Sequence, residues 1–598
     1  LLARLERHQL FLVPLDPEHR WFRFHHLFRQ LLLQRLPELD SSEQRAHISA
    51  RAAEWFAGEG LVEEAIQLWV EAGEVDRAAD LLGHHLHRVI DEDLSRRLLK
   101  RWLELFPPGA IRDRLPLLVA DLYLRVVRWD FEGIAELLER AEEVRKNGIP
   151  QDRQAGPDLF SADLDAVSAF ACFWQGDPAA ALRHAERAFE TIGDSGGGMA
   201  QSLAALYRIG AMPRLGRHDE AFRIVDAETR RELNRSSGRL GVLFFLRAIL
   251  QLYENDLDDV AATVRRWLAA EESTPPYWAA HAPYLLGVVA LEQDRPEEAE
   301  KYFQEVGAFR YLTNSRTFTD SLIGLALVAE RRSDREAMAS RVADARRFAL
   351  DANDPASLEV VESLESRLAR FEGSPPPAPT AATNGLDPMS FWLEVPSITR
   401  AENMLLHPDP EAHRQALAFI DELLARAKMI HNHRQEIRLL VLRSDALEAV
   451  GRTDEAREAL DFALQRAMPH RIVRPFLGGG PRRTAPLESL AARSRRSGFL
   501  KQLLRAVATQ PSYGDESTPA TTAGAGTEIG PPLTRRELET LELLARRLTN
   551  KEIAARLSVT SAAVKKRLES AYAKLDVHTR REAVAAAVAR GFIRTPSL

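Results

Sequence analysis

The chain has 598 residues, which is too long for a single hydrophobic core, so several domains or an extended repeat array are expected. Its 45% hydrophobic and 28% charged residues exclude an intrinsically disordered chain, and no apolar stretch approaches the roughly 18–20 residues that span a bilayer. The net charge is −7, yet residues 532–598 contain 14 Lys and Arg against 7 Asp and Glu. An acidic body with a basic C-terminal segment predicts a polyanionic partner for that segment alone.

The start of the chain and its cysteine content bear on where the protein works. The sequence opens without Met or a signal-peptide pattern, so we expect a piece of something longer, with no membrane partner. Cys172 is the only cysteine, which excludes an internal disulfide and a multi-cysteine zinc site and fits a reducing cytoplasm. Its neighbours are apolar, so we expect a buried structural thiol.

Residues 1–40 carry a short β-pattern followed by a helix. An apolar run over residues 10–15, a turn at Asp16-Pro17 and an alternating segment from Trp21 precede helical spacing. This order predicts the tail of a winged helix. His25 and His26 are adjacent and point to different helix faces, so packing is expected there and not a shared metal.

Residues 41–372 and 391–510 are predicted to be helical repeats. A small residue that opens an apolar helix recurs at steps of 40, 39, 39 and 38, and a later pair is 40 apart: Ala181, Ala221, Val260, Ala299 and Ala337, then Ala416 and Ala456. A fixed period of this size indicates stacked helical hairpins, because each hairpin needs a neighbour to cover its apolar face. The units resemble tetratricopeptide repeats with longer helices or turns. Such an array could bind a peptide, protein or small effector in its groove, or act as a structural spacer.

Two segments read as linkers. Residues 373–390 contain Pro375, Pro376, Pro377 and Pro379, a composition typical of an extended spacer. Residues 511–531 are rich in Thr, Ala and Gly and predict a flexible boundary before the last domain, residues 532–598.

The last domain contains the signals of three closely spaced helices. Thr534 and Glu537 form a capping-box pattern, and Asn550 is a good N-cap for a short helix. After a tight turn, Thr560 caps a helix predicted over residues 561–575.

The helix over residues 561–575 has two different faces. Val564, Leu568 and Leu575 form an apolar stripe, whereas Lys565 and Lys566 lie on the opposite side. A short helix, a tight turn and a longer basic helix describe a helix-turn-helix, whose second helix enters the major groove of double-stranded DNA.

This segment resembles the LuxR-type (GerE-like) helix-turn-helix family. The resemblance rests on the runs Leu533-Thr534-x-Arg536-Glu537, Asn550-Lys551-Glu552-Ile553-Ala554, Val564-Lys565 and Tyr572-x-Lys574-Leu575. The sequence departs from the family pattern at Ala562-Ala563, where Gly-Thr is usual, and at Arg567, where His is usual. The N-terminal segment and the repeats resemble the large MalT-like members of the family, whose winged helix follows an ATPase module.

The resemblance implies roles for individual side chains. We expect Lys565 and Lys566 at base edges, and phosphate contacts from Lys551, Arg567 and Lys574 together with Thr560 and Ser561 at the helix N-terminus. Glu569 pairs with Lys565 along the helix or accepts from a cytosine amino group. A fourth helix would mediate dimer contact on DNA through Ala583, Val584, Ala587 and Val588.

No catalytic or metal-binding motif is evident. The sequence lacks a G-x-x-x-x-G-K-[S/T] loop, an H-E-x-x-H motif and a G-x-S-x-G motif, so we expect no enzyme activity or cofactor in this chain. His431-Asn432-His433 lacks a third ligand nearby in the sequence, so no metal is expected. ATP, if used, would bind an upstream module.

The sequence thus predicts an all-α regulator: a tetratricopeptide-like superhelix with a winged-helix remnant at its N-terminus and a four-helix LuxR-type domain at its C-terminus. By resemblance, its repeats would sense an effector or partner, and its paired DNA-binding domains would recruit RNA polymerase. Two alternatives stay open. One is a protein-binding scaffold with vestigial DNA binding, given Ala562-Ala563. The other is an ATP-driven signalling enzyme whose active part lies upstream.

Overall fold

A computed structural model shows the fold of the chain. It describes residues 12–14, 22–39, 42–91, 95–128, 130–147, 159–193, 198–233, 240–270, 276–310, 313–352, 354–372, 391–478, 481–493, 497–509, 535–545, 550–557, 560–575, 577, 580, 583 and 586–587. Within these ranges the chain is helical apart from one two-stranded sheet, which confirms the predicted all-α class. The chain forms two compact units, residues 1–124 with 137–152 and residues 125–136 with 153–598.

The first unit opens with the predicted β-pattern. β1 (Leu12–Pro14) pairs antiparallel with β2 (Phe22–Phe24), with Leu12 opposite Phe24, and α2 (His26–Leu39) follows. The next helices are α3 (Ser42–Gly58), α4 (Val62–Glu71), α5 (Val75–Asp91), α6 (Ser95–Glu104), α7 (Pro108–Ile111) and α8 (Leu115–Arg128). α9 (Phe131–Asn147) contributes residues to both units.

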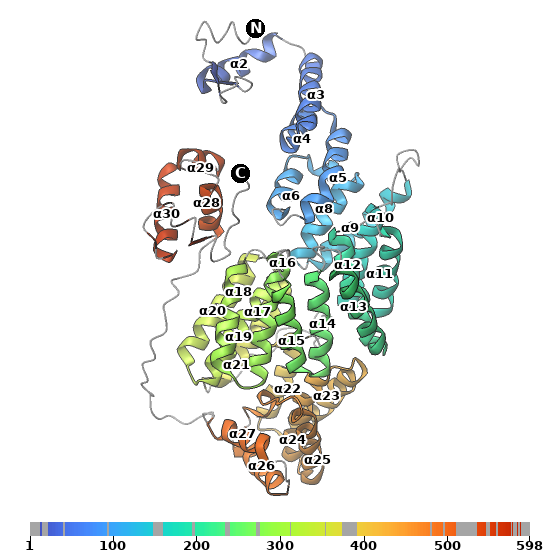
Figure 1. The fold of residues 1–598 in the computed structure, drawn as a ribbon, viewed down its shortest axis with the longest axis vertical. Helices are drawn as coiled ribbons and strands as arrows, with labels where there is room; N and C mark the ends of the chain where they lie inside the picture. Colours follow the sequence, from blue (N-terminus) through green and yellow to red (C-terminus); the bar gives the residue numbers. More distant parts are fainter. Residues whose placement is uncertain are drawn as a thin grey trace. The chain divides into compact units, whose positions relative to one another are not determined.

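The second unit begins with stacked helical hairpins, which lie side by side in Figure 1. The pairs are α10 (Leu159–Trp174) with α11 (Pro178–Ile192), α12 (Gly198–Arg214) with α13 (His218–Leu233), α14 (Leu240–Glu254) with α15 (Leu257–Ala269), α17 (His281–Glu292) with α18 (Pro296–Val306), and α19 (Ser315–Arg331) with α20 (Arg335–Ala352). The short α16 (Pro276–Ala279) and η2 (Gly307–Phe309) lie between them. Every residue of α17 is buried, because the first helix of a pair contacts neighbouring hairpins on both sides.

The turn inside each hairpin explains the repeat period. One or two residues after the end of the first helix, a residue with positive φ recurs at steps of 40, 39, 39 and 39: Gly176, Gly216, Asn255, Asp294 and Ser333. The next amide bonds a carbonyl five residues back, as from Asp256 N to Gln251 O at 2.9 Å. This is a Schellman ending, in which a left-handed residue terminates the helix. The period therefore follows from a repeated way of ending one helix and starting the next.

The recurring small residue is buried where the second helix of each pair begins. The side chains of Ala181, Ala221, Val260 and Ala299 are all fully buried. In the last hairpin Ala337 is half-buried and Met338 is fully buried, so the assignment of Ala337 was wrong by one residue. Met338 N bonds Asp334 O at 3.0 Å, as Ala299 N bonds Arg295 O. The position is defined by its place after the turn, and a larger side chain fits there.

Close packing between hairpins centres on Phe303 of α18. A Cβ atom placed on Gly287 of α17 would lie 2.6 Å from the Phe303 ring, and one on Gly324 of α19 would lie 2.5 Å from it. Real Cβ atoms essentially never approach so closely. The buried ring of Phe303 therefore leaves no room for a side chain at position 287 of α17 or at position 324 of α19.

The later helices of the unit return to the ends of the hairpins. They are α21 (Pro355–Phe371), α22 (Pro396–Leu406), α23 (Pro410–Met429), α24 (His433–Ala449), α25 (Thr453–Ala467), η3 (Arg474–Phe476), α26 (Pro481–Arg493) and α27 (Ser497–Ala508). Val473 N bonds Glu292 O at 2.9 Å, and Arg474 Nη1 lies 3.1 Å from Glu292 Oε1. The proposed linkers 373–390 and 511–531 lie outside the described residues.

A shared carboxylate joins three of these helices. Glu402 of α22 lies 3.3 Å from Arg367 Nη1 and 2.8 Å from Arg370 Nη2 of α21, and 2.9 Å from Arg438 Nη2 of α24. Burial alone would raise the pKa of Glu402, but the three guanidinium groups bring it well below its usual range. Glu402 therefore stays ionised and holds α21, α22 and α24 together.

Cys172 on α10 is less enclosed than predicted. Its side chain is half-buried, because it sits near the end of the helix, before the turn at Gly176. Burial raises the pKa of the Cys172 thiol, and the nearby Asp177 raises it further. The thiol is therefore protonated near neutral pH, as expected of a structural cysteine.

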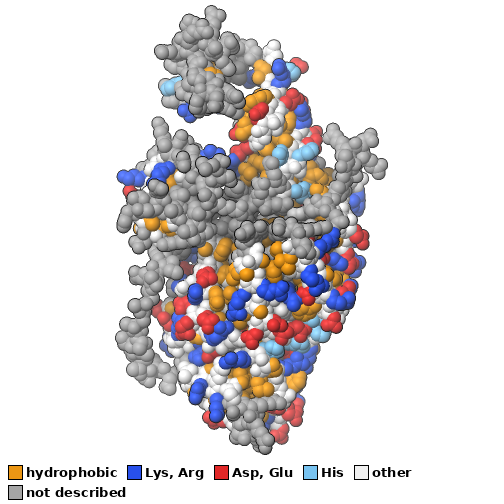
Figure 2. Space-filling view, viewed as in Figure 1, with side chains coloured by type: hydrophobic (Ala, Val, Ile, Leu, Met, Phe, Trp, Pro, Cys, Tyr) orange, Lys and Arg blue, Asp and Glu red, His pale blue; other side chains and the backbone are white. Residues whose placement is uncertain are grey.

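The surface and the helix lengths add two observations. On the face drawn in Figure 2, acidic and basic side chains lie intermingled over the repeats, without one large patch of a single sign. Among the described residues, no helix is both long enough and apolar enough to cross a lipid bilayer.

Candidate nucleic-acid interface

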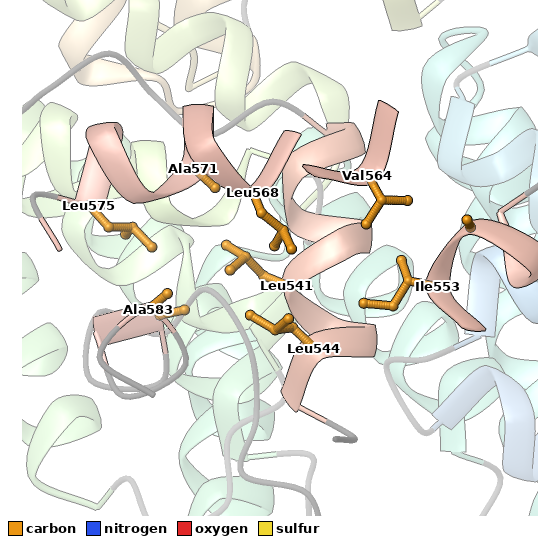
Figure 3. Packing of buried hydrophobic residues seen from close by; sticks show 10 residues of the cluster. Leu541, Leu544, Ile553, Val564, Leu568, Ala571, Leu575 and Ala583 are labelled. Atoms are coloured by element: carbon orange, nitrogen blue, oxygen red, sulfur yellow. The ribbon is translucent and has the colours of Figure 1, made fainter. Parts of the chain in front are cut away.

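The C-terminal domain is built around a small apolar core. Its described helices are α28 (Arg535–Ala545), α29 (Asn550–Arg556) and α30 (Ser561–Leu575), and Figure 3 shows their side chains converging. The buried cluster consists of Leu541, Leu544, Ile553, Ala554, Val564, Leu568, Ala571, Leu575, Ala583 and Ala587. All three helices contribute, so the orientation of α30 is set by packing against α28 and α29.

The start of α30 is fixed by a side-chain cap. Ala563 N donates to Thr560 Oγ1 at 3.2 Å, and the helix runs over the residues predicted for it. The Thr560 cap is therefore confirmed. The side chain of Ser561 lies outside the described part of the structure, as do Thr534 and the turn residues 558–559.

The face of α30 opposite the core carries basic side chains. Lys565 and Lys566 are exposed, whereas the neighbouring Val564 and Leu568 are buried. Lys565 Nζ lies 3.8 Å from Glu569 Oε1, one turn further on, with side-chain exposures of 72% and 63%. The predicted pairing along the helix is thus present. An ion pair this exposed contributes little to stability, so Lys565 can exchange it for another partner.

Lys574 has a partner inside the domain. Its Nζ lies 2.8 Å from Glu537 Oε2, and the two side chains are only 15% and 5% exposed. The bond joins the end of α30 to the first turn of α28. A long-range pair of this kind left no local signal in the sequence. It shows that Lys574 positions α30 within the domain.

The segment after α30 is tied to the rest of the domain. Arg580 Nη1 donates to Asn550 Oδ1 at 3.3 Å, a contact that sequence reasoning missed. Ala583 and Ala587, predicted for dimer contact, are fully buried in the domain core. Their side chains are small and contact α28 and α30 in place of solvent. Val584 and Val588 lie outside the described residues.

The other basic side chains of the domain differ in their exposure to solvent. Arg567 is half-buried on α30, and the side chain of Lys551 lies outside the described set. Arg536 on α28 and Arg556 at the end of α29 are exposed basic residues that the sequence analysis did not single out. Their signal was present, since both fall outside the apolar stripe of their helix.

Comparison with known families identifies both ends of the chain. Residues 531–587 match the model of the bacterial regulatory proteins of the LuxR family (GerE), and residues 1–44 match the MalT winged helix domain. The HTH-type transcriptional regulator MalT of Cronobacter sakazakii is 28% identical over 191 residues, which are 32% of this chain and 20% of that protein. The chain therefore carries a LuxR-type helix-turn-helix domain near its C-terminus and a MalT-type winged-helix segment at its N-terminus.

Other proteins match the chain over parts of their length. MalT of Yersinia enterocolitica is 28% identical over 192 residues, so these matches span about a fifth of the length of the MalT proteins. The serine/threonine-protein kinase PknK of Mycobacterium tuberculosis is 38% identical over 82 residues, 14% of this chain and 7% of the kinase.

Among solved structures, the chain is similar to a Rap protein complexed with competence and sporulation factor. The TM-score is 0.39 at 11% identity, over 72% of this chain and 99% of that one.

Proposed function

We propose that α30 of the C-terminal domain enters the major groove of operator DNA, with Lys565 and Lys566 at base edges. The observation that carries this proposal is the opposition of the two faces of α30: Val564 and Leu568 are buried in the core, while both lysines are exposed. A helix held by its apolar face presents its basic face as a rigid reading surface.

The surrounding side chains would hold the domain on the DNA backbone. Arg567 and Lys551 are proposed for phosphates, joined by the exposed Arg556. The N-terminus of α30, at Thr560 and Ser561, adds backbone amides that favour an anion. Lys574 is the weakest member of the predicted phosphate set, because it already pairs with Glu537.

We also propose that two domains pair on DNA. One small module gives modest affinity, and linking two modules raises it through effective concentration. Ala583 and Ala587 are used inside the domain, so the contact would fall to Val584, Val588 and their neighbours. By resemblance to MalT, the paired domains would then recruit RNA polymerase.

We also propose that the repeats sense an effector beside a buried cluster of charged side chains. Arg316 Nε and Asp320 Oδ1 on α19, and Arg434 Nη1 on α24, have no hydrogen-bond partner among the described residues. Their ion pairs are long: Arg316 Nη2 lies 3.9 Å from Asp320 Oδ1, and Arg434 Nη1 lies 3.6 Å from Glu292 Oε1. Arg316 also lies over the ring of Trp392 at 5.1 Å. Buried polar atoms are nearly always hydrogen-bonded, so a small polar molecule that both donates and accepts would complete the hydrogen bonds of this cluster.

The DNA proposal is tested with the full chain and a randomised duplex pool at two salt concentrations. We expect enrichment of a dyad motif and an affinity that falls steeply as salt rises. Lys565→Ala should weaken specific binding by about 1–3 kcal/mol. Lys501→Ala, an exposed lysine of α27, is the matched control and should leave affinity unchanged. Duplex binding without a motif would reduce the domain to a nonspecific basic module, and no binding would move the function onto the repeats.

Effector sensing is tested by thermal stability in the presence of a panel of polar metabolites. A compound that binds beside Arg316 and Asp320 should raise the Tm of the wild-type chain and not that of the Asp320→Asn variant. If no compound raises the Tm of the wild type, or if both proteins respond equally, the repeats act as a spacer or bind at another place.

A further inference from the structure

Three metal-ligating side chains meet at the junction between the hairpins and the later helices. Glu254 is the last residue of α14, His431 lies in the turn between α23 and α24, and His433 is the first residue of α24. One ligand atom of each lies within 4.8 Å of the others. The sequence left the two histidines without a third ligand, and the fold supplies it from a distant hairpin.

The orientation of His433 is that of a metal ligand. Its Nδ1 lies 3.0 Å from Glu436 Oε2, and Glu436 is buried one turn further along α24. Its Nε2 faces Glu254 Oε2 at 3.6 Å, which is too long for a hydrogen bond. Metal-binding histidines commonly donate their second ring N–H to a carboxylate in this way, which directs the other nitrogen's lone pair to the metal. In the tautomer with the proton on Nδ1, a lone pair of Nε2 and a carboxylate oxygen face each other, and a cation satisfies both.

The charge beside His433 is already compensated. Arg466 Nη1 lies 3.0 Å from His433 Nδ1 and 3.1 Å from Glu436 Oε2. The guanidinium therefore pairs with the Glu436 carboxylate on the side of the ring away from Glu254. Glu254 carries the negative charge on the ligand side.

His218 of α13 closes the cluster from a third direction. Its side chain is about nine-tenths buried, and its ring stacks on that of His431 with centroids 5.4 Å apart. His218 Nε2 lies 2.5 Å from Glu254 Oε1, while its Nδ1 has no hydrogen-bond partner among the described residues.

The backbone at His431 ends α23 as the hairpin turns end their first helices. Its φ is 54°, in the left-handed region, and Asn432 N bonds Ala427 O at 2.9 Å, as in the turns at Asn255 and Asp294. The conformation brings the His431 ring beside His433, with centroids 6.1 Å apart.

We propose that Glu254, His431 and His433 bind a divalent transition-metal ion of the zinc class, with His218 or water as the fourth ligand. Imidazole and carboxylate ligands together suit zinc. Tetrahedral zinc, with bonds of about 2.0–2.1 Å, separates its ligand atoms by about 3.3 Å. Small side-chain rotations from the observed spacing reach that geometry. The bound ion would link the end of α14 to the turn between α23 and α24.

The test is a zinc titration of the full chain after removal of metal, in competition with a chromophoric chelator. We expect one tight ion per wild-type chain and loss of that ion in the Glu254→Gln/His433→Ala double variant. His413→Ala, a half-buried histidine on α23 outside the cluster, is the control and should retain the ion. Equal zinc affinity in the wild type and the double variant, or no tight ion in the wild type, overturns the proposal.

A second variant keeps the test decisive if the double variant is misfolded. Glu436→Gln leaves all three ligands in place and removes the carboxylate that faces both His433 Nδ1 and Arg466. It should weaken zinc binding by about 10–100-fold, with circular dichroism unchanged. Cobalt absorption offers an independent readout, since a tetrahedral site gives an intense visible band in the wild type. A band of equal intensity in the double variant would place the metal elsewhere and overturn the assignment.

Discussion

The helical array and the C-terminal domain place their charged side chains differently. In the array, Glu402 sits among Arg367, Arg370 and Arg438, largely removed from solvent, and joins three helices. On α30 of the C-terminal domain, Lys565 and Lys566 are exposed, and the ion pair of Lys565 with Glu569 is open to water. Removing one partner of a buried ion pair leaves an uncompensated charge without water, whereas hydrated charges can exchange one partner for another.

The largest effect is expected where the array relies on a buried carboxylate. Glu402→Gln leaves three guanidinium groups without their shared counter-charge, so stability should fall by about 3–5 kcal/mol. The measurement is the urea unfolding midpoint of the full chain. Glu411→Gln, which breaks an exposed pair with Arg414, should cost less than about 1 kcal/mol. Similar losses in both variants would contradict the contrast between buried and exposed charges.

The same substitution predicts a pH dependence. The folded-state pKa of Glu402 lies well below its usual value, so its contribution is present above the unfolded-state pKa and is lost as pH falls through the folded-state pKa. The stability difference between wild type and Glu402→Gln should therefore be full at neutral pH and shrink in acid. A difference that stays constant down to strongly acidic pH would assign the effect to packing.

Lys574 lies in the C-terminal domain but forms a buried ion pair like those of the helical array, so it tests the difference between the two regions directly. Its bond to Glu537 resembles the buried pairs of the array, so Lys574→Met should destabilise the C-terminal domain by about 1–3 kcal/mol. In this variant, the slope of the logarithm of DNA affinity against the logarithm of salt concentration should be the same as in the wild type. A phosphate contact would instead reduce the slope by about 0.9. Hydrogen exchange of the domain and a salt titration of DNA binding measure the two effects separately.

Packing between hairpins gives an effect of similar size without any charge. Gly324→Ala places a Cβ 2.5 Å from the buried ring of Phe303, so we expect a loss of about 1–3 kcal/mol in the free energy of unfolding. Gly307→Ala is the control, because a Cβ there meets nothing within 4 Å. If Gly324→Ala unfolds at the wild-type midpoint, the stack between α18 and α19 is looser than the contacts imply.

The smallest effect is expected on α30. Glu569→Gln removes an exposed ion pair, so stability should change by less than about 0.5 kcal/mol. DNA affinity should rise slightly, because a negative charge near the phosphates is lost. A changed base preference at one position of the enriched motif would show that Glu569 accepts from a cytosine.

Features that depend on neighbouring residues could be predicted from the sequence. The Thr560 cap, the bounds of α30 and the Lys565–Glu569 pair all follow from interactions within about one helical turn, which are set by helix geometry alone. The two faces of α30 belong to the same class, because an apolar stripe must turn toward a core.

Features that join distant segments were decided only by the tertiary structure. The pairing of Lys574 with Glu537 and the burial of Ala583 depend on how α28 packs against α30. Glu254 reaches His431 and His433 only because the later helices return to the ends of the hairpins. Which side chains meet across such contacts depends on the angles and offsets at which whole helices pack, and a short stretch of sequence does not specify these.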